Sequence, residues 1–110
     1  MPYDAHLAER VRVALSAEPG LTEMRMFGGI GFLINGNMTC GVHGAGLIVR
    51  VGAEAYADAL AQPGARVFDM TGRPMRGWVL VDPPGCATDD ALRAWVARGA
   101  AQARALPAKG

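Results

Sequence analysis

The stretch MRMFGGIGFLINGNMTCGV, residues 24–42, decides the fold. It places glycine every few residues among β-branched and large apolar side chains, which is typical of strands and not of a helix. Asn35-Gly36 stands in its middle, and a tight type I′ turn needs positive φ at both central positions, which Asn and Gly tolerate best. The stretch therefore predicts a hairpin whose first strand ends at Ile34 and whose second strand starts at Met38.

The next residues extend this hairpin to a three-stranded antiparallel meander. The sequence HGAG at residues 43–46 predicts a second turn, and residues 47–51 alternate as a strand with positions 47, 49 and 51 on one side. Gly28, Gly29 and Gly31 lie at the entry to the meander. A bulge or a bend is expected there, because glycine alone adopts unusual dihedral angles without steric cost.

Helices are predicted before, within and after the strands. Residues 4–17 place apolar side chains at helical spacing, and Asp4 is the expected N-cap. The alanine-rich residues 53–60 predict a short helix, and residues 88–106 a long one with Thr88 as its N-cap and Trp95 on its buried face.

A second hairpin is predicted between the last two helices. It consists of a strand at residues 66–68, a turn near Thr71-Gly72 and a largely buried return strand at residues 77–81, GWVLV. The order is then helix, three strands, helix, two strands, helix. This order predicts one α+β domain over residues 1–110, a two-layer α/β sandwich with its helices on one face of an antiparallel sheet.

The second face of that sheet is expected to be covered. Apolar residues point both ways in GFLI (residues 31–34) and in GWVLV, although one-sided sheets normally alternate apolar and polar residues. On this ground the sequence predicts a homodimer.

Composition excludes several classes of protein. The 110 residues are 51% hydrophobic and 19% charged, a balance that disordered chains lack. The formal net charge of +1 makes nucleic acid a secondary candidate as partner. No apolar run is long enough to span a bilayer, and residues 1–20 lack the pattern of a signal peptide, so a cytoplasmic protein is expected.

Four segments carry a resemblance to a known family. They are RMFGGIGFLINGNM (residues 25–38), GLIVRVG (46–52), TGRPMRGWVLVDP (71–83) and LRAWVARG (92–99). Together they resemble the N-terminal domain of the TfoX/Sxy family. The most specific part is Met26-Phe27-Gly28-Gly29, followed by Gly31 and the Asn35-Gly36 turn, and we expect these residues to have a structural role.

The resemblance implies both a fold and a role. The fold is an α-β(3)-α-β(2)-α sandwich similar to type III secretion chaperones. Full-length members of the family are transcriptional coactivators of competence genes that act with the cyclic AMP receptor protein. Those relatives carry a C-terminal domain as well, so a stand-alone N-terminal module is expected here. The role implied is regulatory, through binding another protein, with the transcription machinery as a candidate partner.

Arginines near a tryptophan form the candidate binding site. Arg25, Arg50, Arg73 and Arg76 lie on predicted strands or in the second hairpin, and the fold could gather some of them near Trp78. Such a patch would suit an acidic protein surface or a small anionic ligand, because arginine pairs bidentately with carboxylate and phosphate. It could also support weak nucleic-acid binding. The alternative is a set of scattered, solvated arginines.

Catalysis, metals and cofactors are not expected. The glycines of GGIG (residues 28–31) lead into a strand and lack a following GK[ST], unlike a phosphate-binding loop. Cys40 and Cys86 are expected to be buried free thiols, and His43 a solvated turn residue without a nucleophile beside it. Three acids serve turns and a helix terminus and are not assigned as metal ligands: Asp82, Asp89 and Asp90.

The methionines are expected mainly to fill the core. Those after Met1 are Met24, Met26, Met38, Met70 and Met75. The last two flank the predicted turn of the second hairpin and are the most probable to be exposed.

Overall fold

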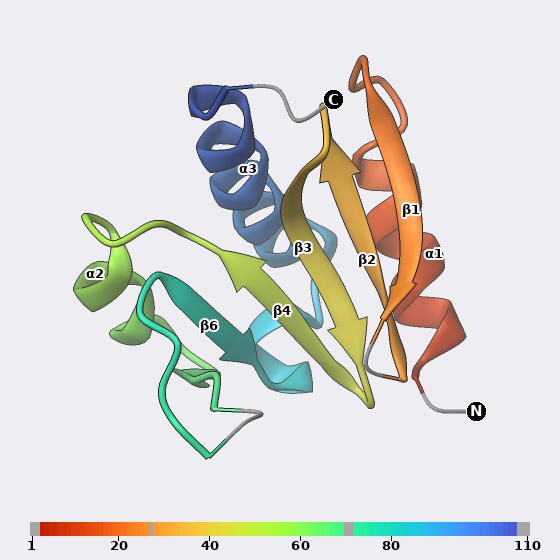
Figure 1. The fold of residues 1–110 in the computed structure, drawn as a ribbon. Coiled ribbons are helices and arrows are strands. Elements are labelled where there is room, and N and C mark those ends of the chain that lie inside the picture. The colour runs from red at the N-terminus through yellow and green to blue at the C-terminus, as the bar shows by residue number, and fades with distance from the viewer. Residues whose placement is uncertain (1–2, 27, 70–71, 108–110) are drawn as a thin grey trace.

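A computed structural model describes the chain except for residues 1–2, 27, 70–71 and 108–110. Figure 1 shows the elements in chain order. The helices are α1 (Ala5–Ala14), α2 (Tyr56–Leu60), the 3-10 helix η1 (Pro83–Cys86) and α3 (Asp89–Ala105). The strands are β1 (Leu21–Met26), β2 (Gly29–Ile34), β3 (Asn37–His43), β4 (Gly46–Arg50), β5 (Ala65–Val67) and β6 (Trp78–Val81).

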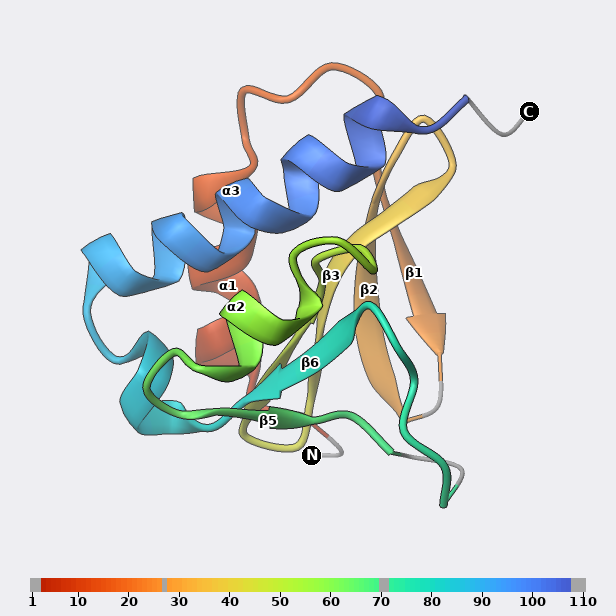
Figure 2. The ribbon, with the colours of Figure 1, turned by 90° about the vertical axis from the view of Figure 1, so that its left-hand side faces the viewer.

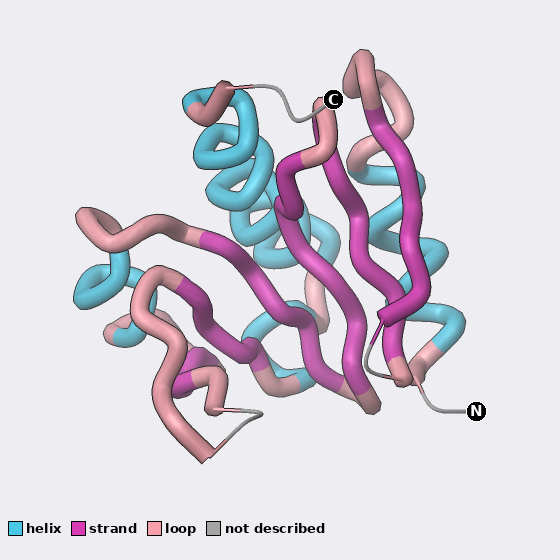
Figure 3. Tube along the Cα trace, in the orientation of Figure 1, coloured by secondary structure: helices cyan, strands magenta, loops and turns pink. Residues whose placement is uncertain are grey.

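The six strands form one antiparallel sheet in the order β1-β2-β3-β4-β6-β5. Helices α1 and α3 lie behind the sheet in Figure 1, and the view from the side in Figure 2 separates the two layers. The predicted α+β sandwich with an antiparallel sheet is therefore confirmed. The tube in Figure 3 shows the strands running side by side across the face opposite the helices.

The first group of strands has four members, one more than the predicted meander. Residues 21–26 form β1, which pairs with β2 along its whole length from Leu21↔Ile34 to Met26↔Gly29. The sequence LTEMRM alternates polar and apolar side chains only weakly. For this reason the sequence pattern did not predict β1 as a strand distinct from the glycine-rich strand that follows. The turn between β1 and β2 includes Gly28 at φ 75°, where a bulge or bend was predicted.

The Asn35-Gly36 turn is confirmed. Both residues have positive φ, 52° for Asn35 and 81° for Gly36, and they connect β2 to β3. Asn35 is the one non-glycine residue with positive φ in the described chain. The turn also closes against the preceding loop, because the Asn35 N–H donates to the Gly20 carbonyl at 3.1 Å.

A bulge between β2 and β3 changes which side chains share a face. The register shifts between Phe32 and Leu33, leaving Thr39 as the extra residue on β3. Its hydroxyl donates to the Phe32 carbonyl at 2.8 Å and is fully buried. Met38 and Cys40 therefore lie on opposite faces, whereas uninterrupted alternation along the strand would place them on the same one.

The core lies between the helices and the sheet. Phe32, Val49 and Val79 are fully buried on its sheet side. On the helix side, Trp95 is 5% exposed, as predicted, and its indole N–H donates to the Gly85 carbonyl at 3.2 Å. Helix α3 approaches β3 closely at Gly99, where an added Cβ would lie 2.3 Å from the Thr39 carbonyl oxygen.

Both predicted N-caps are present. The Asp4 carboxylate accepts from the N–H groups of His6 and Leu7, and the Thr88 hydroxyl accepts from the Ala91 N–H. Each bond satisfies a backbone donor that the first helical turn leaves free. Helix α1 ends at Ala14, three residues before the predicted boundary. No helix of the described residues is long and apolar enough to cross a membrane.

Candidate interaction surface

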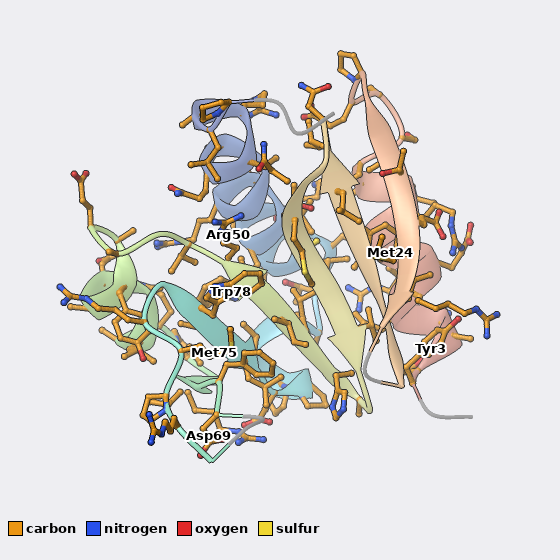
Figure 4. All side chains as sticks on the ribbon, viewed as in Figure 1. Tyr3, Met24, Arg50, Asp69, Met75 and Trp78 are labelled. Atoms are coloured by element: carbon orange, nitrogen blue, oxygen red, sulfur yellow. The ribbon has the colours of Figure 1, made fainter. Side chains whose placement is uncertain are left out.

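The sheet face opposite the helices, here named the open face, is built by alternate residues of the strands. The cross-strand pairs show which residues lie on this face: Leu33 lies opposite Met38, Ile48 opposite Leu80, and Arg50 opposite Trp78. On β1 the same face carries Thr22 and Met24, which pair with Leu33 and Gly31. Figure 4 looks onto this face and labels several of its side chains.

Apolar side chains dominate the open face. Met24 is 54% exposed, and Leu33, Met38, Trp78 and Leu80 are half-buried. A sheet with one face on the core normally presents polar residues to water on the other. An apolar surface in that place is typical of a site that contacts another molecule.

The connection between β5 and β6 extends this surface. It projects to the open-face side of the sheet in Figure 2, and Met75 within it is 36% exposed. The connection is held by the Met75 N–H, which donates to the Phe68 carbonyl at 2.9 Å. Exposure of Met75 agrees with its expected place on the surface, whereas Met24 was expected in the core and is not. Met70 lies outside the described residues.

Arg50 and Trp78 place a positive charge on the open face beside an aromatic ring. They face each other on β4 and β6, and the guanidinium carbon lies 5.4 Å from the ring centroid. Stacking on the indole fixes the long arginine side chain while leaving its N–H donors available. The pair thus offers a flat apolar surface beside a fixed cation.

Ion pairing separates the arginines into two groups. Those bonded to a carboxylate are Arg10, Arg12, Arg66, Arg93, Arg98 and Arg104. Within the residues that the structure describes, the other four have no carboxylate within 4.0 Å, and they are the four that the sequence singled out: Arg25, Arg50, Arg73 and Arg76. A cation without a partner in its own chain can pair with a charge on another molecule.

The fold brings together only part of the predicted arginine patch. Arg73 and Arg76 are exposed in the connection that leads from β5 into β6, and Trp78 at the start of β6 stacks with Arg50. Arg25 lies on β1, at the opposite edge of the sheet, and its cross-strand partner Ile30 faces the helices. Arg25 therefore belongs to a different surface.

The glycine string has structural roles where it is described. An added Cβ on Gly29 would lie 2.2 Å from the Val42 carbonyl oxygen, and Gly31 lies opposite Gly41 in the β2–β3 pair. Gly29 and Gly41 let β2 and β3 approach where a side chain would not fit. Met26 ends β1, and Phe27 lies outside the described residues.

The thiols are poorly suited to nucleophilic chemistry. Burial raises the pKa of the Cys40 thiol to about 12, and it raises the pKa of Cys86 as well. Both thiols are therefore protonated at neutral pH, whereas the thiolate is the nucleophilic form. His43 is exposed at the end of β3.

A groove of about 360 Å³ lies between α1 and α3, on the helix side. Its charged walls are already neutralised, because Arg10 lies 3.4 Å from Asp89 and Arg93 lies 2.7 Å from Asp90. Among the described side chains, no group of three potential metal ligands gathers here or elsewhere. The groove therefore ranks below the open face as a candidate site.

Comparison with known proteins gives one family. The model of the TfoX N-terminal domain matches residues 14–103, which include all six strands and most of α3. No curated protein matches the chain.

Proposed function

Because the chain belongs to the family of TfoX N-terminal domains, we propose that it is a regulatory or adaptor module that binds another protein through the open face. It has no catalytic role in this proposal and uses no metal or cofactor. It works in the cytoplasm as a homodimer, and it takes part in regulating transcription, as the competence regulators that resemble it do.

One observation supports the proposal above all others: the Arg50–Trp78 pair is stacked on an apolar sheet face. Among the described residues, no carboxylate lies within 4.0 Å of the Arg50 guanidinium. Tryptophan and arginine are the residues that most often dominate binding energy at protein interfaces. Met24 and Met75 add flexible apolar contacts at either end of the face.

The same arrangement describes the partner. Arg50, and the exposed Arg73 and Arg76 of the β5–β6 connection, favour a surface with acidic side chains, and the apolar side chains of the open face favour leucine-like or aromatic ones. The partner is thus an acidic protein segment with apolar residues interspersed. Extensive phosphate binding is less favoured, since the net charge is only +1.

Capture from lysate with surface variants tests this function. Met75→Glu and Arg50→Glu each place a negative charge on the open face without removing a buried side chain. Each variant is expected to reduce capture of the partner by at least tenfold, or about 1.4 kcal/mol, because the added charge is desolvated and repels the acidic partner. Quantitative mass spectrometry of the bound fraction measures the loss.

Val13→Glu is the matched control. Val13 is 64% exposed on α1, on the other layer, so the same apolar-to-acidic change there should leave capture unchanged. Equal capture by all variants would contradict the proposal. If no specific partner is recovered and small anions raise the melting temperature, the chain is a ligand sensor instead. If it shifts nucleic acid with a steep salt dependence, it is a nucleic-acid binder.

A further inference from the structure

Strand β1 is the long open edge of the sheet. It is six residues long and, among the residues that the structure describes, pairs only with β2, whereas the opposite edge strand β5 has three residues and contacts α2. Edge strands present unpaired backbone N–H and C=O groups, and proteins usually keep such edges short or cover them. The edge of β1 is therefore the place where a further strand can add to this sheet.

The hairpin determines which backbone groups point outward. In antiparallel pairs, residues alternate between those bonded to the neighbouring strand and those that point away from it. The Asn35 N–H bonds to the Gly20 carbonyl, so Gly20 and every second residue after it point toward β2. The outward donors and acceptors then belong to Leu21, Glu23 and Arg25.

Two of these three residues carry opposite charges on the same side of the strand. Glu23 and Arg25 pair with Phe32 and Ile30, so both lie on the helix side of the sheet. Glu23 accepts from Arg12 at 2.7 and 2.9 Å. Arg12 also contacts Glu9, so this group of three carries a net charge of −1. Arg25 contributes the balancing +1 and is exposed.

We propose that a second copy of this chain adds to the sheet through β1, antiparallel, with Met24 of both copies on the two-fold axis. In this register Glu23 lies opposite Arg25 of the other copy, twice by symmetry. The neighbouring registers that pair outward residues place Glu23 opposite Glu23, or Arg25 opposite Arg25, and like charges directly opposite are destabilising. Charge complementarity therefore selects this register alone.

The inference rests on the homodimer of the proposed function, but it places the interface at the edge of the sheet and not on the open face. The two-fold axis is perpendicular to the sheet, so two six-stranded sheets join as one and both open faces look the same way. Met24, 54% exposed in one chain, is then packed against its copy. The Arg50–Trp78 ends remain free for partner protein at both ends of the dimer.

Disulfide crosslinking tests the register. Directly opposite residues in a non-hydrogen-bonded pair have Cα atoms about 4.5 Å apart, which a disulfide can bridge. Met24→Cys is therefore expected to crosslink nearly completely under mild oxidation with diamide. Thr22→Cys is the control, because its two copies would lie about 14 Å apart along the strands. The native thiols of Cys40 and Cys86 are buried and should not interfere.

Charge variants provide a second test that does not depend on thiols. Arg25→Glu and Glu23→Lys should each halve the mass measured by light scattering, since each places like charges opposite one another. An equimolar mixture of the two should recover the dimer mass, because each pair is then complementary. Arg73→Glu makes the same charge change on an exposed turn and should stay dimeric.

The outcomes separate this interface from the proposed function. A dimer that Arg25→Glu leaves intact, or faster crosslinking of Thr22→Cys than of Met24→Cys, overturns the edge interface. A monomeric wild-type chain overturns it too. Binding of partner through the open face is measured independently, because Met75→Glu should lose the partner and keep the dimer mass. Circular dichroism verifies that each variant is folded.

Discussion

Cys40 shows how burial controls a single residue. The thiol lies fully within the core beside Thr39, and desolvation of the thiolate raises its pKa to about 12. An accessible thiol has a pKa of about 8.5. Native protein should therefore react with a disulfide reagent at a small fraction of the rate shown by the urea-unfolded chain. Rapid stoichiometric labelling of the native thiol would contradict its burial.

The same shift predicts how stability depends on pH. Between about pH 9 and pH 12 the unfolded chain has lost the Cys40 proton while the folded chain retains it, so the free energy of unfolding falls as pH rises. The slope from this group is at most about 1.4 kcal/mol per pH unit. Urea denaturation of wild type and Cys40→Ala across this range measures it. The variant should lose less stability with rising pH, and parallel curves would exclude the thiol as the cause.

Some residue environments were readable from the sequence and others were not. The Asn35-Gly36 turn, the Asp4 and Thr88 caps and the burial of Trp95 follow from local chemistry, and all are present. The exposure of Met24 was not readable, because methionine suits both core and surface. Only the position of β1 at the edge of the sheet decides it.

At the scale of elements, α3 approaches the backbone of β3 closely at a glycine of its buried face. An added Cβ on Gly99 would lie 2.3 Å from the Thr39 carbonyl oxygen, which belongs to backbone and cannot rotate away. Gly99→Ala should therefore destabilise the protein by roughly 1–3 kcal/mol, the usual cost of overpacking. Chemical denaturation measures the loss.

The helix itself provides the comparison for that prediction. In an exposed helical position, replacing glycine by alanine stabilises by about 1 kcal/mol. Ala97→Gly, at an exposed position two residues earlier, should accordingly lower stability by about this amount. If Gly99→Ala instead raised stability, helical propensity would outweigh the contact, and the close approach of α3 to β3 would be wrong.

The element order could be predicted almost completely, but not the first strand or the bulge. The periodicity of residues 47–51 and 88–106 is strong, because each has one face in the core. Strand β1 lies at the edge of the sheet, so its sequence shows little periodicity of apolar residues. At the bulge the Thr39 hydroxyl donates to the Phe32 carbonyl on the neighbouring strand, a contact that the alternation of residues along one strand does not reveal.

At the scale of the whole molecule, the two faces of the sheet have different roles. The helices and one sheet face form the core, and the charges on the helix side are largely paired within the chain. The open face keeps apolar side chains and the Arg50–Trp78 pair available for contact. The sequence predicted that arginines gather near Trp78; the structure places Arg50 over its ring, and a wider patch stays a prediction. The sequence could not predict that Arg25 lies apart, because the strand order decides that.

Quenching of tryptophan fluorescence by acrylamide, with and without the captured partner, tests the central claim most directly. Trp78 is half-buried on the open face and accessible to the quencher, whereas Trp95 is buried and provides a constant background. If partner protein binds the open face, adding it should protect the accessible tryptophan, and Trp78→Phe should abolish the change. Unaltered quenching at saturating partner would show that binding occurs elsewhere and would contradict the account.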